Sequence, residues 1–156
     1  MKGKRNLKVE AIEKGTVIDH IRAGQALNVL RILGISSDFR ATISFVMNAI
    51  GARGKKDVVK IEGKELSVEE LNKIALISPT ATINIIRDFE VVQKNNVVLP
   101  PSVEGVVRCT NSKCISNSNE PIKSKFSVQQ SEEEGVTLRC LYCEHVISEN
   151  IAENLL

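Results

Sequence analysis

Aromatic residues and long apolar runs are both scarce in this chain of 156 residues. Aromatic side chains make up 3% of it, so few are available to stack on the bases of a nucleic acid. The longest apolar run, Ile74 to Ile77, is far shorter than the roughly 20 residues that a membrane-spanning helix needs. The start, Met-Lys-Gly-Lys-Arg-Asn, lacks the apolar core of a signal peptide. We therefore expect a soluble, cytoplasmic protein.

Cysteine is scarce as well, but its 4 copies are clustered. Cys109 and Cys114 form a C-x4-C pair, and Cys140 and Cys143 form a C-x2-C pair further along the chain. Two such pairs are typical of a structural site in which four thiolates hold one tetrahedral zinc ion. Four ligands leave no position open for water or substrate. We therefore expect these cysteines to bind a zinc ion that stabilises the fold and takes no part in catalysis.

Other interpretations of the cysteines remain open. Two disulfides would require an oxidising compartment, which the start of the chain does not indicate. Iron in a rubredoxin-like site fits the same spacing. His145 is a further candidate ligand, although four thiolates already complete a tetrahedral set. With every thiol assigned to the metal and only 2 histidines in the chain, we expect no catalytic site.

Charge divides the chain into two parts of opposite sign. Residues 1–99 contain 16 Lys and Arg against 11 Asp and Glu, which gives +5, whereas residues 100–156 contain 5 against 8, which gives −3. Phosphate contacts dominate nucleic-acid binding, so a zinc module that binds DNA or RNA should be basic. A nucleic-acid-binding zinc ribbon is the alternative that the four cysteines favour, but the acidic second part opposes it.

Hydrophobic periodicity predicts an α+β fold for the first part. Ser67 and Glu70 form a capping box at the start of the second helix, which ends before Ser78-Pro79. The order strand, helix, strand, strand, helix, strand predicts a ferredoxin-like sandwich, an antiparallel sheet with two helices on one face. Strands are expected at 7–12, 40–47, 58–62 and 80–92, a further extended piece at 16–21, a basic turn at 51–57, and helices at 22–33 and 67–77.

We predict two domains joined by a short connection. Residues 1–98 form the sandwich, residues 99–102 are a linker stiffened by Pro100-Pro101, and residues 103–156 form a small, mainly β, zinc-binding domain. A module of about fifty residues buries too little apolar surface to be stable alone. We therefore expect the zinc ion to hold residues 103–150 folded.

Five polar residues lie in or beside apolar strands of the first domain: Asp19, His20, Lys60, Asn84 and Lys94. Counting with a period of two puts Lys60 and Asn84 on one face of the sheet. Lysines there can bind phosphates, and a carboxylate can accept a hydrogen bond from a ribose hydroxyl. A solvated face with scattered charges explains the same residues equally well.

Several stretches resemble the regulatory chain of aspartate carbamoyltransferase. The most specific are Lys14-Gly-Thr-Val-Ile-Asp-His-Ile21 and the two cysteine pairs, Cys109-Thr-Asn-Ser-Lys-Cys-Ile-Ser116 and Cys140-Leu-Tyr-Cys-Glu144, and the likeness covers nearly the whole chain. The resemblance implies a non-catalytic subunit that binds CTP as inhibitor or ATP as activator in its N-terminal domain. The zinc domain would contact the catalytic chain. It also implies regulatory dimers within a dodecamer of six catalytic and six regulatory chains.

By position, the resemblance also implies a nucleotide site in the N-terminal domain. Backbone groups near Ile12 and Phe89 would select the base, and Lys56 would lie near a second nucleotide or its metal, for which UTP with Mg²⁺ is a candidate. The implied site residues are Glu10, Ile12, Asp19, His20, Lys56, Lys60, Asn84, Ile86, Phe89, Val91 and Lys94.

A free-standing sensor of small molecules without an enzyme partner is a third interpretation of the chain.

Overall fold

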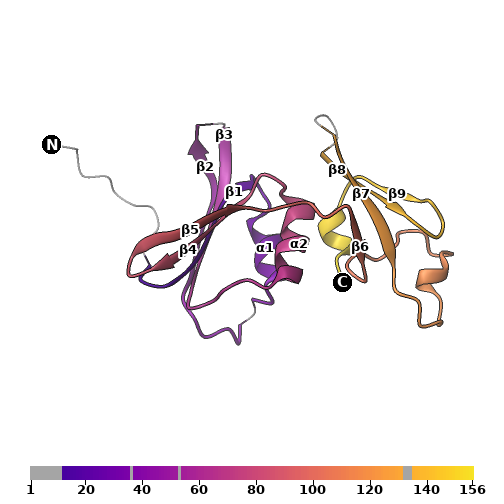
Figure 1. The fold of residues 1–156 in the computed structure, drawn as a ribbon, viewed down its shortest axis with the longest axis horizontal. Coiled ribbons are helices and arrows are strands. Elements are labelled where there is room, and N and C mark those ends of the chain that lie inside the picture. Colours follow the sequence, from indigo (N-terminus) through magenta and orange to yellow (C-terminus); the bar gives the residue numbers. More distant parts are fainter. Residues whose placement is uncertain (1–11, 36, 53, 132–134) are drawn as a thin grey trace. The chain divides into compact units, whose positions relative to one another are not determined.

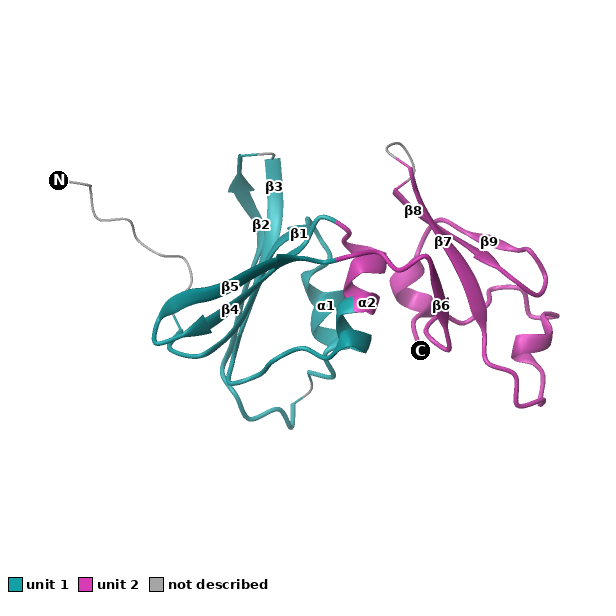
Figure 2. Cartoon of the chain, in the orientation of Figure 1, with its two compact units in different colours: residues 1–71, 80–97 teal, residues 72–79, 98–156 magenta. Residues whose placement is uncertain are grey.

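The computed structural model describes residues 12–35, 37–52, 54–131 and 135–156. These residues form two compact units, one within 12–71 and 80–97 and the other within 72–79 and 98–156 (Figure 2). The strand predicted at 7–12 lies outside the described residues, except for Ile12. None of the described helices is long and apolar enough to cross a membrane.

The first unit is built on an antiparallel sheet of five strands in the order β2-β3-β1-β4-β5 (Figure 1). Without β5, this is the strand order of a ferredoxin-like sandwich, and the predicted α+β class is confirmed. The elements up to residue 97 are β1 (Gly15–Arg22), α1 (Ala26–Ile32), β2 (Ile43–Gly51), β3 (Gly54–Glu62), α2 (Val68–Ile77), β4 (Thr82–Arg87) and β5 (Glu90–Asn96). The division between the two units falls inside α2, after Leu71.

One face of the sheet is apolar and is the core of this unit. Ile18 of β1 and both Val59 and Ile61 of β3 are fully buried, and so are Ala26 and Val29 of α1. α1 packs against β2 and β3. Because side chains alternate between the two faces of a strand, the residues next to these apolar ones project from the opposite face, which we call the open face.

The start of the first helix differs from the prediction. The extended piece predicted at 16–21 is present as β1, the first strand among the described residues, and it continues to Arg22. α1 therefore begins at Ala26 and not at residue 22. The chain turns between them at Gly24, whose φ of 91° is accessible to glycine and costly for other residues.

Two predicted boundaries in the hairpins are wrong. The turn predicted at 51–57 is a tight connection in which Gly51 pairs with Gly54, so residues 54–57 belong to β3. The single strand predicted at 80–92 is a hairpin of β4 and β5. Asp88 and Phe89 form its two-residue turn with φ of 52° and 66°, a conformation that usually selects Asn-Gly and is not expected from Asp-Phe.

The capping box at the start of α2 is present as predicted. The Ser67 N–H donates to Oε1 of Glu70, and the Glu70 N–H donates to Oγ of Ser67, both at 3.1 Å. α2 ends at Ile77, directly before Ser78-Pro79, because the residue ahead of a proline is disfavoured in helical geometry.

The second unit contains a four-stranded antiparallel sheet in the order β6-β7-β8-β9. Its core includes the fully buried side chains of Val107, Phe126 and Leu138. This agrees with the predicted small β domain, while the exact domain limits remain a prediction. The elements are β6 (Ser102–Glu104), η1 (Ile115–Asn117), β7 (Lys125–Ser131), β8 (Gly135–Cys140), β9 (Val146–Ile147) and η2 (Ile151–Asn154).

Candidate functional site

A row of directly opposed residues crosses four strands on the open face. Lys60 of β3 pairs with Val17 of β1, Val17 pairs with Asn84 of β4, and Asn84 pairs with Lys94 of β5. Residues that stand opposite each other in antiparallel strands project from the same face. The register therefore agrees with the shared face that the period of two gave for Lys60 and Asn84, and it adds Lys94.

A β-bulge brings His20 to this face, beside Asp19, which pairs with Thr82 of β4. β1 pairs Ile18 with Val59 but Ile21 with Asp57, so it holds one extra residue, and His20 has a φ of 56°. Bulges re-aim side chains in this way. A strict alternation would put Asp19 and His20 on opposite faces, but both of them contact residues of the open face.

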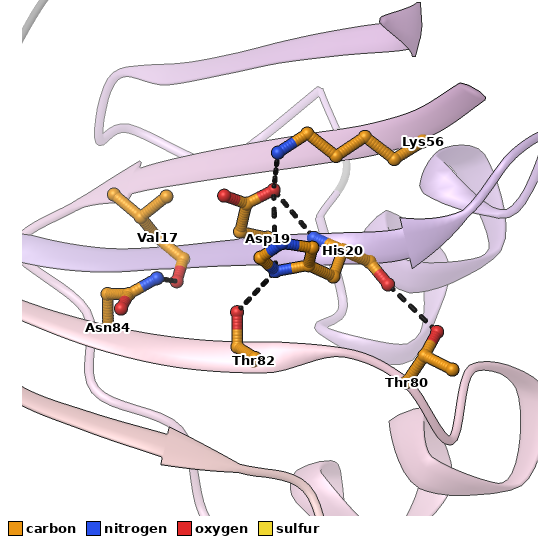
Figure 3. A network of polar contacts seen from close by, with 7 residues as sticks. All are labelled: Val17, Asp19, His20, Lys56, Thr80, Thr82 and Asn84. Atoms are coloured by element: carbon orange, nitrogen blue, oxygen red, sulfur yellow. Dashed lines mark hydrogen bonds and ion pairs between the residues drawn. The ribbon is translucent and has the colours of Figure 1, made fainter. Parts of the chain in front are cut away.

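The contacts of these two residues form a network (Figure 3). Oδ1 of Asp19 lies 2.8 Å from Nζ of Lys56, and Nδ1 of His20 lies 3.0 Å from Oγ1 of Thr82. Nδ2 of Asn84 donates to the backbone oxygen of Val17 at 3.4 Å. Lys56 and Thr82 alternate in step with Lys60 and Asn84 along their own strands, so the whole network lies on the open face.

The carboxylate of Asp19 is held in its charged form. Partial burial acts to raise its pKa, but the hydrogen bonds from Lys56 and from the His20 N–H, together with the charge of Lys56, outweigh burial and lower the pKa. The His20 N–H donates to Oδ1 at 2.6 Å. The open face therefore combines a fixed negative charge with several lysines.

Two chain segments meet at the end of this face. The Phe89 N–H in the β4–β5 turn donates to the backbone oxygen of Glu13 at 3.0 Å, next to the buried Ile12. Ile86 and Val91 also pair with each other, on the same face as Asn84. The backbone groups expected to select a base therefore meet at the β4–β5 turn.

The structure brings together nearly all residues predicted for the nucleotide site. Glu10 lies outside the described residues. Thr82 was missed, although it lies two residues before Asn84 on the same strand and the period of two could have found it. The open face carries Asp19, His20, Lys56, Lys60, Asn84, Ile86, Val91 and Lys94, and Ile12 and Phe89 come from the two segments at its end.

The four cysteines converge in the second unit. Their Sγ atoms all lie within 4.8 Å of one another, with 3.6 Å between Cys109 and Cys143 and 3.7 Å between Cys114 and Cys140. A disulfide needs about 2.05 Å between its sulfurs. Zn–S bonds of about 2.3 Å in a tetrahedron give sulfur separations of about 3.8 Å. The thiols therefore fit a tetrahedral metal ion and are not arranged as disulfides.

The surroundings shift the pKa values of these thiols in opposite directions. Burial raises the pKa of Cys109 to about 12 and also raises the pKa of Cys140. The backbone N–H of His145 and the side chain of Asn111 lower the pKa of Cys143 to about 6. Because metal ligands are thiolates, a bound cation has to displace protons from the buried thiols.

Asn117 closes the longer cysteine arm. Its side-chain Nδ2 donates to the backbone oxygens of Cys109 at 2.9 Å and Asn111 at 2.8 Å, and its backbone N–H donates to the oxygen of Cys114 at 2.9 Å. Oγ of Ser116 lies 3.1 Å from Sγ of Cys114. Among the described residues, the metal-ligating group contains the four cysteines alone, so His145 is not part of it.

Comparisons with known proteins agree over the whole chain. A family model described as "Aspartate carbamoyltransferase regulatory chain, allosteric domain" matches residues 7–98, and one described as "Aspartate carbamoyltransferase regulatory chain, metal binding domain" matches residues 101–153. The regulatory chain of Methanosarcina mazei is 87% identical over 156 residues, and that of Methanosarcina barkeri is 86% identical, each with 100% of both chains covered. The regulatory chain of Methanococcoides burtonii is 59% identical over 97% of this chain and 95% of its own length.

Proposed function

Because the chain belongs to the family of aspartate carbamoyltransferase regulatory chains, we propose that it binds CTP and ATP on the open face and transmits allosteric control of pyrimidine biosynthesis to the catalytic chain. It acts as a non-catalytic subunit, in the cytoplasm. The single observation that supports this proposal most is the register that aligns Lys60, Val17, Asn84 and Lys94.

The row suits a nucleoside triphosphate because its two ends are cationic. Neighbouring strands are spaced about 4.8 Å apart, so the backbones of Lys60 and Lys94 stand about 14 Å apart, three strand spacings along the row. Long lysine side chains that reach inward from both ends can contact one chain of phosphates between them. Charge-assisted bonds from ammonium groups to phosphate oxygens then supply most of the affinity.

The remaining residues have distinct roles in this proposal. Asp19 accepts a hydrogen bond from a ribose hydroxyl, and backbone groups beside Ile12 and Phe89 select the base. Asn84 contacts the nucleotide between the two lysines. Lys56 and His20 lie next to Asp19 and contact a second nucleotide or its Mg²⁺, with UTP as the second effector. Glu10, Ile86 and Val91 complete the site.

In the second unit, Cys109, Cys114, Cys140 and Cys143 hold one structural Zn²⁺. The ion supplies cross-linking of the chain and no reaction chemistry, since four thiolates fill its coordination sphere. Residues 103–156 form the zinc domain and contact the catalytic chain. Residues 1–98 form the allosteric domain, through which regulatory chains pair in a dodecamer of six catalytic and six regulatory chains.

Coupling in this proposal runs through the linker at 99–102. Pro100 and Pro101 restrict its flexibility, so a change in one domain alters the orientation of the other. An effector shifts a quaternary equilibrium only by its difference in affinity between the two states, usually about 1 to 3 kcal/mol.

Calorimetric titration tests the proposal directly. The purified, zinc-loaded chain is titrated with CTP, ATP and UTP, alone and assembled with its catalytic partner. We expect saturable binding of CTP and ATP, with different affinities in the free and assembled chain. A chain that binds none of the three nucleotides in either state contradicts the proposal, whereas a chain that never co-elutes with a catalytic partner supports a free-standing sensor.

A further inference from the structure

We infer that Asp57 is a positioning residue for the open face: from the opposite side of the sheet, its carboxylate fixes the backbone that presents Asp19 and His20. The inference goes beyond the proposed function, because it assigns a role to a residue that projects away from the proposed ligand. It rests on the proposed function only in expecting that nucleotide affinity depends on the arrangement of Asp19 and His20.

The carboxylate of Asp57 is fully buried and fully engaged by backbone groups. Its exposed fraction is 0%. Oδ2 accepts hydrogen bonds from the N–H groups of Gly24 and Ala26, both at 2.9 Å, and Oδ1 accepts one from the N–H of Asn48 at 2.8 Å. A buried carboxylate is costly unless its oxygens are bonded, so these three bonds specify the conformation around it.

The three bonds connect Asp57 of β3 to the chain segments of both flanking strands, β2 and β1. β2 bulges between Val46 and Ala49, where Asn48 has a φ of 61°. β1 bulges between Ile18 and Ile21, and Ile21 pairs with Asp57 itself. One carboxylate therefore binds inside the bulge of β2 and, on the other side, the turn that follows the end of β1.

The turn from β1 into α1 depends on the same carboxylate. Gln25 precedes α1 and makes no capping hydrogen bond with its side chain. Asp57 supplies the missing acceptor for the Ala26 N–H and also holds the Gly24 N–H. An acidic group near the start of a helix is favourable for its charge as well. Asp57 therefore holds the chain at Gly24 and Ala26, three and five residues after Ile21.

This anchor determines where His20 points. The extra residue of the bulge lies between Ile18 and Ile21, and both of these pair with residues of β3. A slip of one residue in a strand moves its side chains to the other face, so loss of the anchor after Ile21 allows the bulge to shift or disappear. His20 would then lose Thr82, and Asp19 would lose the hydrogen bond from the His20 N–H.

The test substitutes Asp57→Asn, which keeps the shape but replaces one oxygen with an NH₂ group. At least one of the three backbone N–H groups then faces a donor. In the folded, zinc-loaded chain we expect NMR signals of the His20 ring and the Asp19 carboxyl to move, and the Kd for CTP to rise about tenfold, equivalent to about 1.4 kcal/mol. Glu65→Gln is the control, because it removes an exposed carboxylate that lies 3.4 Å from Arg87 in the same unit.

A second variant keeps the inference testable if Asp57→Asn does not fold. Gly24→Ala adds a Cβ that meets nothing within 4 Å, but the φ of 91° is strained for alanine and displaces one donor from Asp57. We expect smaller changes in the same direction. Unchanged His20 and Asp19 signals in a folded variant of either kind overturn the inference. If the wild-type chain binds no nucleotide but these signals still move, the positioning role stands and the proposed function fails.

Discussion

The ammonium group of Lys56 lies 2.8 Å from the carboxylate of Asp19, and the two residues come from neighbouring strands on the open face. This ion pair lowers the pKa of Asp19 against the opposing effect of burial. In the proposed function, an incoming phosphate competes with Asp19 for the same ammonium group, which links nucleotide binding to the protonation of Asp19.

We predict that Lys56→Met raises the pKa of Asp19. Without the hydrogen bond and charge of Lys56, burial is opposed mainly by the His20 N–H. In the wild type, the lowered pKa contributes stability above the unfolded value near 3.8, and this contribution is lost as the pH falls through the folded pKa. The variant should lose stability at a higher pH. Carboxyl NMR titration and urea unfolding between pH 3 and 7 measure both effects.

An unchanged Asp19 titration in Lys56→Met would show that the ion pair contributes nothing in solution. The pair is partly exposed, with side-chain exposures of 26% for both partners. Added salt screens such pairs. The wild-type pKa should therefore rise with salt concentration, while that of the variant changes less.

We predict that Lys60→Ala and Lys94→Ala each weaken CTP and ATP binding about ten- to a hundredfold, because a charged hydrogen bond contributes roughly 1.5 to 3 kcal/mol. Gln93→Ala is the matched control, since Gln93 pairs with Ile85 and projects to the other face of β5. Calorimetry measures the affinities. Equal effects at positions 93 and 94 would contradict the proposed orientation of the nucleotide.

The sequence predicted what depends on local periodicity and spacing. Alternation put Lys60 and Asn84 on one face, Ser67 and Glu70 indicated the start of α2, and the paired spacing indicated the cysteine cluster. These features need only residues close together in the chain.

Features set by distant partners could not be predicted. The bulge at His20 depends on pairing with β3 and on the carboxylate of Asp57. Asp57 lies in a basic, glycine-rich stretch that predicts a turn, yet its side chain is fully buried. The turn at Asp88 and Phe89 likewise departs from the residue types that favour positive φ.

Removal of the metal should unfold the second unit selectively. A structural zinc ion contributes on the order of 10 kcal/mol of apparent binding energy to folding, and a module of this size has a small core. We expect a chelator to abolish the NMR signals of β6 to β9 and leave those of β1 and β3. Cys114→Ser should have the same effect without the chelator. Retention of the β7–β8 signals after complete zinc removal would contradict the structural role.

The last prediction concerns Asn117, whose amide and backbone N–H bind the oxygens of both cysteines of the C-x4-C arm. A loop of four residues between ligands has more freedom than one of two, so its closure by Asn117 should pre-organise the thiols. Residues that orient metal ligands typically change affinity about 10- to 100-fold when they are substituted. Asn117→Ala should therefore release zinc to a competing chelator faster and with a weaker Kd, whereas Asn119→Ala, at an exposed position nearby, should not. Because both variants keep all four thiolates, a Co²⁺ absorption spectrum of tetrahedral thiolate type in each one separates loss of affinity from loss of a ligand. Equal zinc retention in the two variants would show that the cysteine arm closes without the Asn117 amide.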